Sequence, residues 1–325
     1  MAQLTKLIKR RIRSVKNTKQ ITKAMELVAA AKMRHSIAAA SASRTYASKA
    51  WELLTNLAQM VDPQQHDLLT IRPIKKICII FFSSNRGLAG AFNTNLNKKL
   101  EKFISSSQIL THHDRTSEKI PKGVEEISDL KIDYITVGKK GAQYLRRNGR
   151  KIIAAFDTMS DVPSMDKVTP IMEIAVEEYR KGNYDRVVLV YSNFESIMLQ
   201  EAKIRQLLPI SAFDLEKTIL SAGGQKISDA KPKELKPTDL KLFLFEPSAD
   251  QVLDSLLMNL VKVQIYQVAL ETAASKYSAR MIAMSNATES ADEMIKELEQ
   301  SYNQSRQTAI TQEIAEISSG VESLA

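Results

Sequence analysis

The chain has 325 residues, of which 44% are hydrophobic and 26% are charged, and its formal net charge is +9. This composition is typical of a folded protein and excludes disorder as the main state. No run of about 18 apolar residues occurs, and the basic start lacks the apolar stretch of a secretory signal. Cys78 is the only cysteine and lies in an apolar run, which predicts a buried, inert thiol and excludes an internal disulfide. We therefore expect an intracellular protein that is soluble or peripheral to a membrane.

Helix-breaking residues are confined to the middle of the chain. The first proline is Pro63 and the first glycine is Gly87, and after Pro247 neither type occurs until Gly320. The stretches on either side are far longer than the usual globular helix of about 11 to 12 residues. At about 1.5 Å per residue they predict helical rods of roughly 90 and 110 Å.

The C-terminal stretch carries a heptad repeat. Apolar residues dominate positions a and d from Leu253 to about residue 302, which is the pattern of a coiled-coil seam, and the pattern then fades. A looser apolar stripe follows the N-terminal stretch at three- and four-residue steps. Because both stripes belong to one chain, an antiparallel pair within the chain would bury both. The N-terminal stripe consists of Leu4, Ile8, Ile12, Val15, Ile21, Met25, Val28 and Met33.

Between the two rods, short apolar segments alternate with helical ones. This alternation favours a mostly parallel, Rossmann-like sheet. The predicted fold class is therefore α/β, with a long antiparallel coiled coil of the N- and C-terminal helices plus a central Rossmann-like α/β domain. The expected parts are an N-terminal coiled-coil helix (1–62), the Rossmann-like domain (63–247) and a C-terminal coiled-coil helix (248–325). The expected strands are 75–82, 132–137, 151–156 and 186–191, with further candidates at 198–208 and 242–245, and the expected helices are 93–104, 140–147 and 168–181.

Charge is distributed unevenly along the chain. Residues 1–62 hold twelve Lys or Arg against three acids, 63–247 hold 29 against 23, and 248–325 hold 5 against 11. The two rods therefore attract each other, and the excess positive charge of the first predicts an acidic partner, nucleic acid or an anionic membrane surface. A run of cations without acids at the usual i,i+4 positions favours a partner over a merely solvated helix face. The run is Lys6, Lys9, Arg10, Arg11, Arg13, Lys16, Lys19 and Lys23.

Motifs for catalysis are incomplete. The turn 83–93 follows a strand and precedes a helix, a place that can bind phosphate, but it lacks the third glycine of a dinucleotide fingerprint. The segment 138–141 (GKKG) has the wrong spacing for a phosphate-binding loop, so we expect structural turns. His112 and His113 lack the further ligands that a zinc site needs, and no serine elbow occurs. The sequence predicts no catalytic, metal-binding or cofactor-binding site.

Three blocks of sequence resemble one known family. Residues 21–34 (ITKAMELVAAAKMR) closely resemble the start of the gamma subunit of the F-type ATP synthase. Residues 84–93 (SNRGLAGAFN) resemble that family's Ser-Asp-Arg-Gly-Leu-Cys-Gly-Gly-Phe-Asn. The C-terminal block from 246 to 314, which ends in YNQSRQTAITQEI, follows the family's last helix almost position for position. Because the blocks occur in order and reach both ends, the chain is identified as a member of this family.

The resemblance implies a function as the central rotor shaft of the F-type ATP synthase. In this family the paired helices enter a ring of three alpha and three beta subunits, and the Rossmann-like domain sits on the c-ring, with the epsilon subunit as a further partner. Ion-driven rotation of the c-ring is thereby coupled to conformational change and ATP synthesis at the catalytic beta subunits. The shaft itself is not an enzyme and needs no cofactor, metal, nucleic acid or small-molecule substrate. The implied location is the cytoplasmic side of a bacterial inner membrane, as a peripheral protein.

An alternative based on charge alone is a basic coiled-coil protein that binds nucleic acid. It differs from the rotor shaft in salt-dependent affinity for DNA and in whether nucleotide-binding subunits co-purify. However, the clear heptads lie at the opposite end of the chain from the basic run, unlike a basic region that continues into a zipper.

The resemblance also implies which residues contact the beta subunit. A basic stretch of the N-terminal helix faces the acidic lever segment of beta, and positions near the C-terminus engage beta loops at the catch. Beyond residue 302 a lone helix tip is expected. The implied contacts are Lys23, Met25, Lys32 and Arg34 at the lever, and Arg306, Gln307, Thr311 and Glu313 at the catch.

The chain departs from the family pattern in the turn after the first strand. Asn85 stands where the family has aspartate, and Ala89 stands where it has cysteine. A role that needs that charge or thiol is therefore not expected here, and the two-cysteine redox insertion of the chloroplast form cannot operate.

Overall fold

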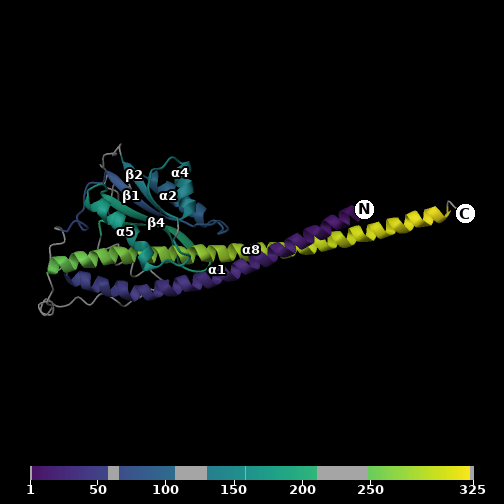
Figure 1. Cartoon of the computed structure of the whole chain (residues 1–325), viewed down its shortest axis with the longest axis horizontal. Helices are drawn as coiled ribbons and strands as arrows, with labels where there is room; N and C mark the ends of the chain where they lie inside the picture. Colours follow the sequence, from purple (N-terminus) through teal and green to yellow (C-terminus); the bar gives the residue numbers. More distant parts are fainter. Residues whose placement is uncertain (1, 58–65, 107–129, 158, 211–247, 323–325) are drawn as a thin grey trace. The chain divides into compact units, whose positions relative to one another are not determined.

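The computed structural model describes residues 2–57, 66–106, 130–157, 159–210 and 248–322 (Figure 1). The chain divides into two compact units, one formed by 1–30 with 280–325 and the other by 31–279. Two long helices, α1 (Ala2–Leu57) and α8 (Ala249–Glu322), each contribute to both units. None of the helices in the described ranges is long and apolar enough to cross a membrane.

Some sequence expectations fall outside those ranges. The candidate strand at 242–245, the segment 215–241 and the histidine pair at 112 and 113 are not among the described residues. The expected domain boundaries at 62/63 and 247/248 also fall in or beside ranges that are not described.

The unit formed by 31–279 contains a five-stranded sheet in the order β3-β2-β1-β4-β5. The first four strands are parallel, and β5 runs antiparallel to β4. This arrangement confirms the Rossmann-like sheet. The candidate strand at 198–208 is its edge strand and runs antiparallel to its neighbour. The strands are β1 (Lys76–Phe82), β2 (Lys131–Val137), β3 (Ile152–Phe156), β4 (Arg186–Phe194) and β5 (Gln200–Leu208).

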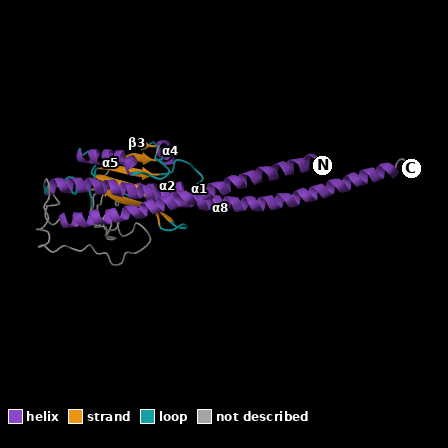
Figure 2. Ribbon diagram, turned by 60° about the horizontal axis from the view of Figure 1, so that its bottom comes forward, coloured by secondary structure: helices purple, strands orange, loops and turns teal. Residues whose placement is uncertain are grey.

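Helices cover both faces of the sheet, which explains why β1 is apolar throughout (Figure 2). Alternate side chains of a strand point to opposite faces. Ile79 packs with α2 (Phe92–Ile104) and α4 (Lys139–Arg147), whereas Ile80 packs with α5 (Met165–Arg180) and α8. Cys78 is fully buried on the α8 side, and burial raises the pKa of its thiol far above the usual value, which confirms the predicted inert thiol.

A long segment near the start of α8 belongs to the core of the α/β unit. From Leu260 to Ser278 every residue except Lys262, Tyr266 and Lys276 is buried. The heptad correctly placed buried positions here, but it could not show that the sheet covers the other faces of the helix. The side chains that pack with β1, β4 and α5 include Leu253, Leu257, Leu260, Val261, Ile265, Val268 and Ala269.

In the other unit, α1 and α8 run antiparallel. Three polar contacts between them join rising numbers in α1 to falling numbers in α8, which confirms the predicted antiparallel coiled coil. The contacts are Lys16 Nζ with Glu299 Oε1 at 2.8 Å, Lys19 with Asp292, and Thr22 Oγ1 with Thr288 Oγ1 at 2.8 Å.

The seam of α1 differs from the predicted apolar stripe at two positions. Ile21 and Val28 were expected inside, but they are 60% and 54% exposed. Thr22 and Ala29, the next residues along, lie on the inner side instead, and Ala29 is 1% exposed. Successive residues of a helix point about 100° apart, so a shift of one position exchanges an inner for an outer place. Thr22 is stable inside because its hydroxyl has a hydrogen-bond partner on α8.

The pairing of α1 with α8 also extends further than the heptad indicated. Ile8 is buried, and Tyr302, Ser305 and Ala309 are half-buried, whereas every described residue from Ile310 to Ser319 is exposed. The expectation of a lone helix directly after residue 302 was therefore wrong by about two turns. The cause is that the first turns of α1 still cover α8 there.

The glycine-containing turn after β1 leads into α2 and forms hydrogen bonds with the start of α4. The first N–H groups of a helix lack partners within the helix and are the groups that could bind a phosphate. Here residues of the turn accept three such groups from α4, which supports the prediction that the 138–141 segment is a structural turn. Lys139 N–H donates to Asn85 Oδ1 (3.2 Å), Lys140 N–H to the Ser84 carbonyl (3.0 Å) and Gly141 N–H to Ser83 Oγ (2.8 Å).

The two glycines of the 138–141 segment allow α4 to approach β1 closely. Gly138 has φ +104°, and a Cβ there would lie 2.4 Å from the Ser83 carbonyl oxygen. A Cβ on Gly141 would lie 2.7 Å from the Phe81 ring and from Ser83 Oγ. The two glycines of this segment are therefore needed for packing against β1 and the turn after it.

Replacing Gly138 with Ala should reduce the free energy of unfolding by at least about 3 kcal/mol, because backbone strain and a clash with the strand add together. The matched control is Gly149→Ala, since Gly149 has φ +66° but no atom within 4 Å of the added Cβ. That variant should lose only about 1–2 kcal/mol. Urea unfolding followed by circular dichroism measures both, and equal losses would contradict the close approach.

Candidate subunit-contact surface

The outer face of α1 carries positive charge that the chain does not neutralise. Lys16 and Lys19 pair with acids on α8, and Lys23 Nζ lies 3.0 Å from Glu26 Oε1 in its own helix. Among the residues that the structure describes, the cations of the preceding turns are exposed and form no ion pair. They are Lys6, Lys9, Arg10, Arg11 and Arg13.

The four residues expected at the lever of beta have different surroundings. Lys23 and Met25 belong to the unit that contains 1–30, whereas Lys32 and Arg34 belong to the other. The side chain of Lys23 is 54% exposed, Met25 is half-buried and Arg34 is exposed. Lys32 differs from the others because its ammonium pairs with Asp161 in the loop between β3 and α5.

The four residues expected at the catch are all exposed on α8. Thr311 Oγ1 donates to the Gln307 carbonyl at 2.9 Å, so this hydroxyl is used within the helix. Arg306 and Glu313 form no ion pair within the described part of the chain. Their charged groups are therefore free to contact another subunit.

Exposed apolar side chains accompany these polar residues on both helices. Isolated exposed apolar residues are ordinary, but several along one rod indicate a surface that contacts another molecule. Sequence analysis missed this signal on α1 because it assigned Ile21 and Val28 to the seam. The exposed side chains are Leu7 (62%), Ile21, Leu27 (61%) and Val28 on α1, and Ile310 (47%), Ile314 (61%) and Ile317 (68%) on α8.

Lys32 belongs to a polar cluster that the sequence did not predict. Its Nζ pairs with Asp161 and lies 5.7 Å from the centre of the Tyr277 ring, and Lys276 Nζ lies 4.4 Å from the same ring. The hydrogen bond from Lys32, followed by the Tyr277 hydroxyl, lowers the pKa of Asp161 to about 2. Residues from α1, α8 and the β3–α5 loop thus meet at one place.

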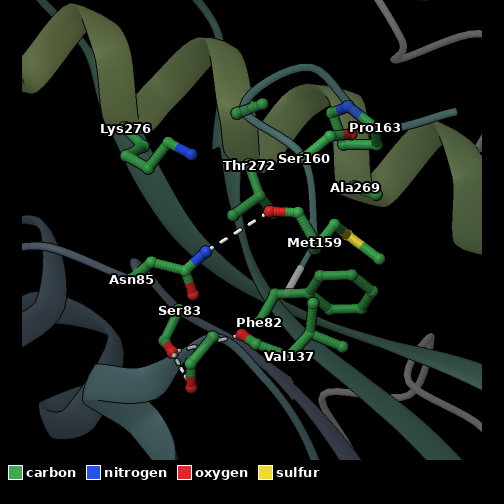
Figure 3. A pocket seen from close by; sticks show the side chains of 12 residues that line it. Phe82, Ser83, Asn85, Val137, Met159, Ser160, Pro163, Ala269, Thr272 and Lys276 are labelled. Carbon is green, nitrogen blue, oxygen red and sulfur yellow. Dashed lines mark hydrogen bonds between the residues drawn. The ribbon is translucent and has the colours of Figure 1, made fainter. Parts of the chain in front are cut away.

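A hollow lies beside this cluster, at the carboxyl ends of β1 and β2 (Figure 3). Its cavity volume is about 30 Å³, which is far below the roughly 300–1,000 Å³ of ligand pockets. Phe82, Val137 and Met159 make part of its wall apolar, and Lys276 and Thr272 line it from α8. Across it, Asn85 Nδ2 donates to the Met159 carbonyl at 3.3 Å.

Comparison with known proteins places the chain among the subunits of one complex. The ATP synthase family profile matches residues 4–324. The ATP synthase gamma chain of Acidithiobacillus ferrooxidans is 38% identical over 316 residues, which are 97% of each chain. The chain belongs to the ATP synthase gamma-chain family. The gamma chain of Legionella pneumophila is 32% identical over 98% of this chain and 99% of its own, and that of Trichlorobacter lovleyi is 36% identical over 100% and 99%.

Solved structures of ATP synthases contain the same fold. A chain of the Euglena gracilis mitochondrial enzyme, from its OSCP/F1/c-ring part, matches 100% of this chain and 95% of its own with a TM-score of 0.61 at 18% identity. A chain from the central stalk and c-ring of the Tetrahymena thermophila enzyme has a TM-score of 0.53 at 20% identity, over 82% and 99%.

Membership of the gamma-chain family makes this chain the rotor-stalk subunit, which is a non-catalytic part of an enzyme complex. This confirms the family, the function and the non-catalytic nature that the sequence predicted. The comparisons give no support to the alternative of a nucleic-acid-binding protein.

The pKa of Asp161 provides a test of the polar cluster. A carboxyl group with a lowered pKa stabilises the fold above its unfolded pKa of about 3.9, and this contribution is lost as the pH falls toward 2. Lys32→Ala should raise the pKa of Asp161 toward its ordinary value, as measured by an NMR titration of the Asp161 carboxyl carbon. Lys151→Ala is the control, because Lys151 pairs with Asp133 and should leave Asp161 unchanged. An Asp161 titration that Lys32→Ala does not shift would contradict the pairing.

Proposed function

We propose that this chain turns as the central shaft that couples ion-driven rotation of a c-ring to ATP synthesis at catalytic beta subunits. The observation that carries the proposal is the antiparallel pair of α1 and α8, whose outer face keeps cations and apolar side chains that have no partner among the residues the structure describes. Such a surface is suited to sliding contacts with acidic and apolar surfaces of a surrounding ring.

The proposed partners are three alpha and three beta subunits, an epsilon subunit and the c-ring. Two similar structures come from the F1/c-ring part and from the central stalk with the c-ring of their enzymes, which supports an assembly of this kind. The proposed location is peripheral, at the cytoplasmic side of a bacterial inner membrane. The relatives compared above come from bacteria, which supports this location.

At the lever, we propose that Lys23, Met25 and Arg34 contact the acidic segment of beta. The exposed ammonium and guanidinium groups of Lys23 and Arg34 can pair with carboxylates, and half-buried Met25 adds apolar contact. Lys32 is the fourth residue implied by the family resemblance. Its ammonium pairs with Asp161 and has further N–H donors for a contact with beta.

At the catch, we propose that Arg306, Gln307, Thr311 and Glu313 engage beta loops. The planar guanidinium of Arg306 has five N–H donors, which suit a bidentate contact with a carboxylate or with carbonyl groups. Such contacts are made in only some rotary positions, so they affect turnover more than assembly.

Reversing the charge of Lys23 and Arg34 together (Lys23→Glu, Arg34→Glu) tests the lever contact. Exposed substitutions change stability by less than about 0.5 kcal/mol, so a large functional effect must come from a partner. The complex should remain isolable from solubilised membranes with its nucleotide-binding subunits, but ATP synthesis driven by an ion gradient should fall steeply. The matched control reverses Lys98 and Arg146, two exposed cations on α2 and α4. Normal ATP synthesis in the double variant would contradict the proposed contact of Lys23 and Arg34 with beta.

Replacing Arg306 and Gln307 with Ala tests the catch. The alpha–beta–gamma complex should still assemble, but its turnover should slow by roughly tenfold, since one hydrogen bond to a charged group contributes about 1.5 kcal/mol. Lys296→Ala with Glu297→Ala changes two exposed residues of the same helix and serves as the control. Wild-type turnover of the Arg306 and Gln307 variant would exclude these residues from the function.

A further inference from the structure

The two long helices are attached to the α/β unit by different forces. The first part of α8 lies in the apolar core, and hydrogen bonds from Ser275 Oγ to the Ser192 carbonyl (3.1 Å) and from Ser278 Oγ to the Ile197 carbonyl (2.6 Å) fix its position against the sheet. Rotation of the sheet therefore carries α8 with it.

The part of α1 in the same unit is attached through the polar cluster. Lys32 pairs with Asp161, and the ammonium groups of Lys32 and Lys276 both lie near the Tyr277 ring of α8. One turn further along α1, Ser36 is fully buried. The cluster thus connects α1 both to α8 and to the β3–α5 loop.

The β3–α5 loop is itself fixed to the sheet. Asn85 Nδ2 donates to the Met159 carbonyl (Figure 3), and Asn85 Oδ1 accepts the Lys139 N–H at the start of α4. Only an amide can make both contacts, because a carboxylate has no N–H to donate to the Met159 carbonyl. The aspartate that the family resemblance places at this position could accept from Lys139 but could not hold Met159. The asparagine of this chain therefore adds a link between the turn after β1 and the loop that carries Asp161.

The cluster lies at the place where both helices pass from one compact unit to the other. The division falls between Ala30 and Ala31 in α1 and between Ala279 and Arg280 in α8. Lys32 and Tyr277 are the second and third residues inside it. If only one helix of a coiled coil is anchored at its base, the other helix can slide along it when the coil is twisted. If both helices are anchored, the coil resists twisting more strongly.

We propose that Lys32, Asp161 and Tyr277 form a torsional latch, which fixes α1 to the α/β unit so that both helices turn with the sheet. The latch acts between residues of this chain and gives Lys32 a positioning role. The inference rests on the proposed rotation of the chain as a shaft. This role of Lys32 differs from the contact with beta that the family resemblance implies.

The test uses the assembled complex and measures the angular fluctuation of a stalled rotor in single molecules. Lys32→Ala and Asp161→Ala should each increase the angular variance roughly twofold, a modest change in keeping with a half-exposed ion pair. The double variant should show no further increase, and the exchange of charges (Lys32→Asp with Asp161→Lys) should restore the wild-type variance. Lys181→Ala is the matched control, because Lys181 pairs with Glu177 on α5 at similar exposure.

A cross-link that spans the two lost side chains separates the latch from a beta contact: Lys32→Cys and Asp161→Cys are joined by a short bis-methanethiosulfonate reagent, which reduction removes. With the latch, the cross-linked complex should turn over like the wild type, and reduction should loosen the rotor. If Lys32 instead acts on beta, the cross-linked and reduced complexes should both lose turnover, and this outcome overturns the latch. Wild-type variance in Asp161→Ala would overturn it as well.

Hydrogen exchange of the full-length chain distinguishes failure of the latch from failure of the proposed function. Amides of α1 near Lys32 should exchange roughly twofold faster in Lys32→Ala and Asp161→Ala than in Lys181→Ala, and the exchange of charges should reverse this. Unchanged protection would contradict the latch whether or not the chain assembles. A wild-type chain that fails to assemble with ring-forming subunits would contradict the proposed function alone.

Discussion

The burial of one half of α8 in the core of the sheet is the constraint on which the rest of the structure depends. From Leu260 to Ser278 nearly all of its side chains are buried, and beyond Arg280 only one stripe remains covered. No glycine or proline interrupts the helix between 248 and 319, so its backbone hydrogen bonds run without a break from core to rod. A rotation of the sheet is therefore transmitted to the rod through a continuous helix.

The partner helix α1 is held by weaker and more polar interactions. Its inner side has the buried apolar residues Ile8 and Met33 but also Thr22, Ala29 and Ser36, which bury little apolar area and therefore gain little from the hydrophobic effect. Hydrogen bonds and ion pairs compensate for this, with Thr22 on α8 and Lys32 on the β3–α5 loop. The difference leaves apolar and cationic side chains of α1 on the outside, where a surrounding ring can use them.

The turn after β1 shows how a family motif acquires a physical meaning. The sequence block SNRGLAGAFN suggested either a phosphate site or a turn, and incomplete glycine spacing favoured the turn. The structure shows its purpose in packing, since Ser83, Ser84 and Asn85 supply the caps of α4, and Gly138 allows the contact. The departure from aspartate to Asn85 has a consequence as well, because only the amide also holds Met159.

Local sequence determined the elements of this protein. The absence of helix breakers defined the long helices, the apolar runs defined the strands, and opposite net charges predicted that the ends of the chain attract each other. The motifs identified the family and proposed its contact residues. All of these properties depend on neighbouring residues, whose spacing and chemistry can be taken directly from the chain.

Only the tertiary structure decided which surfaces meet. It placed Thr22 inside and Ile21 outside, although apolarity favoured the reverse, because the register between α1 and α8 sets the seam. It also buried α8 on nearly all sides in the sheet domain and joined Lys32 to Asp161, 129 residues apart. Such contacts depend on how helices and strands pack in space, and many different packings satisfy the same local pattern of apolar and charged residues.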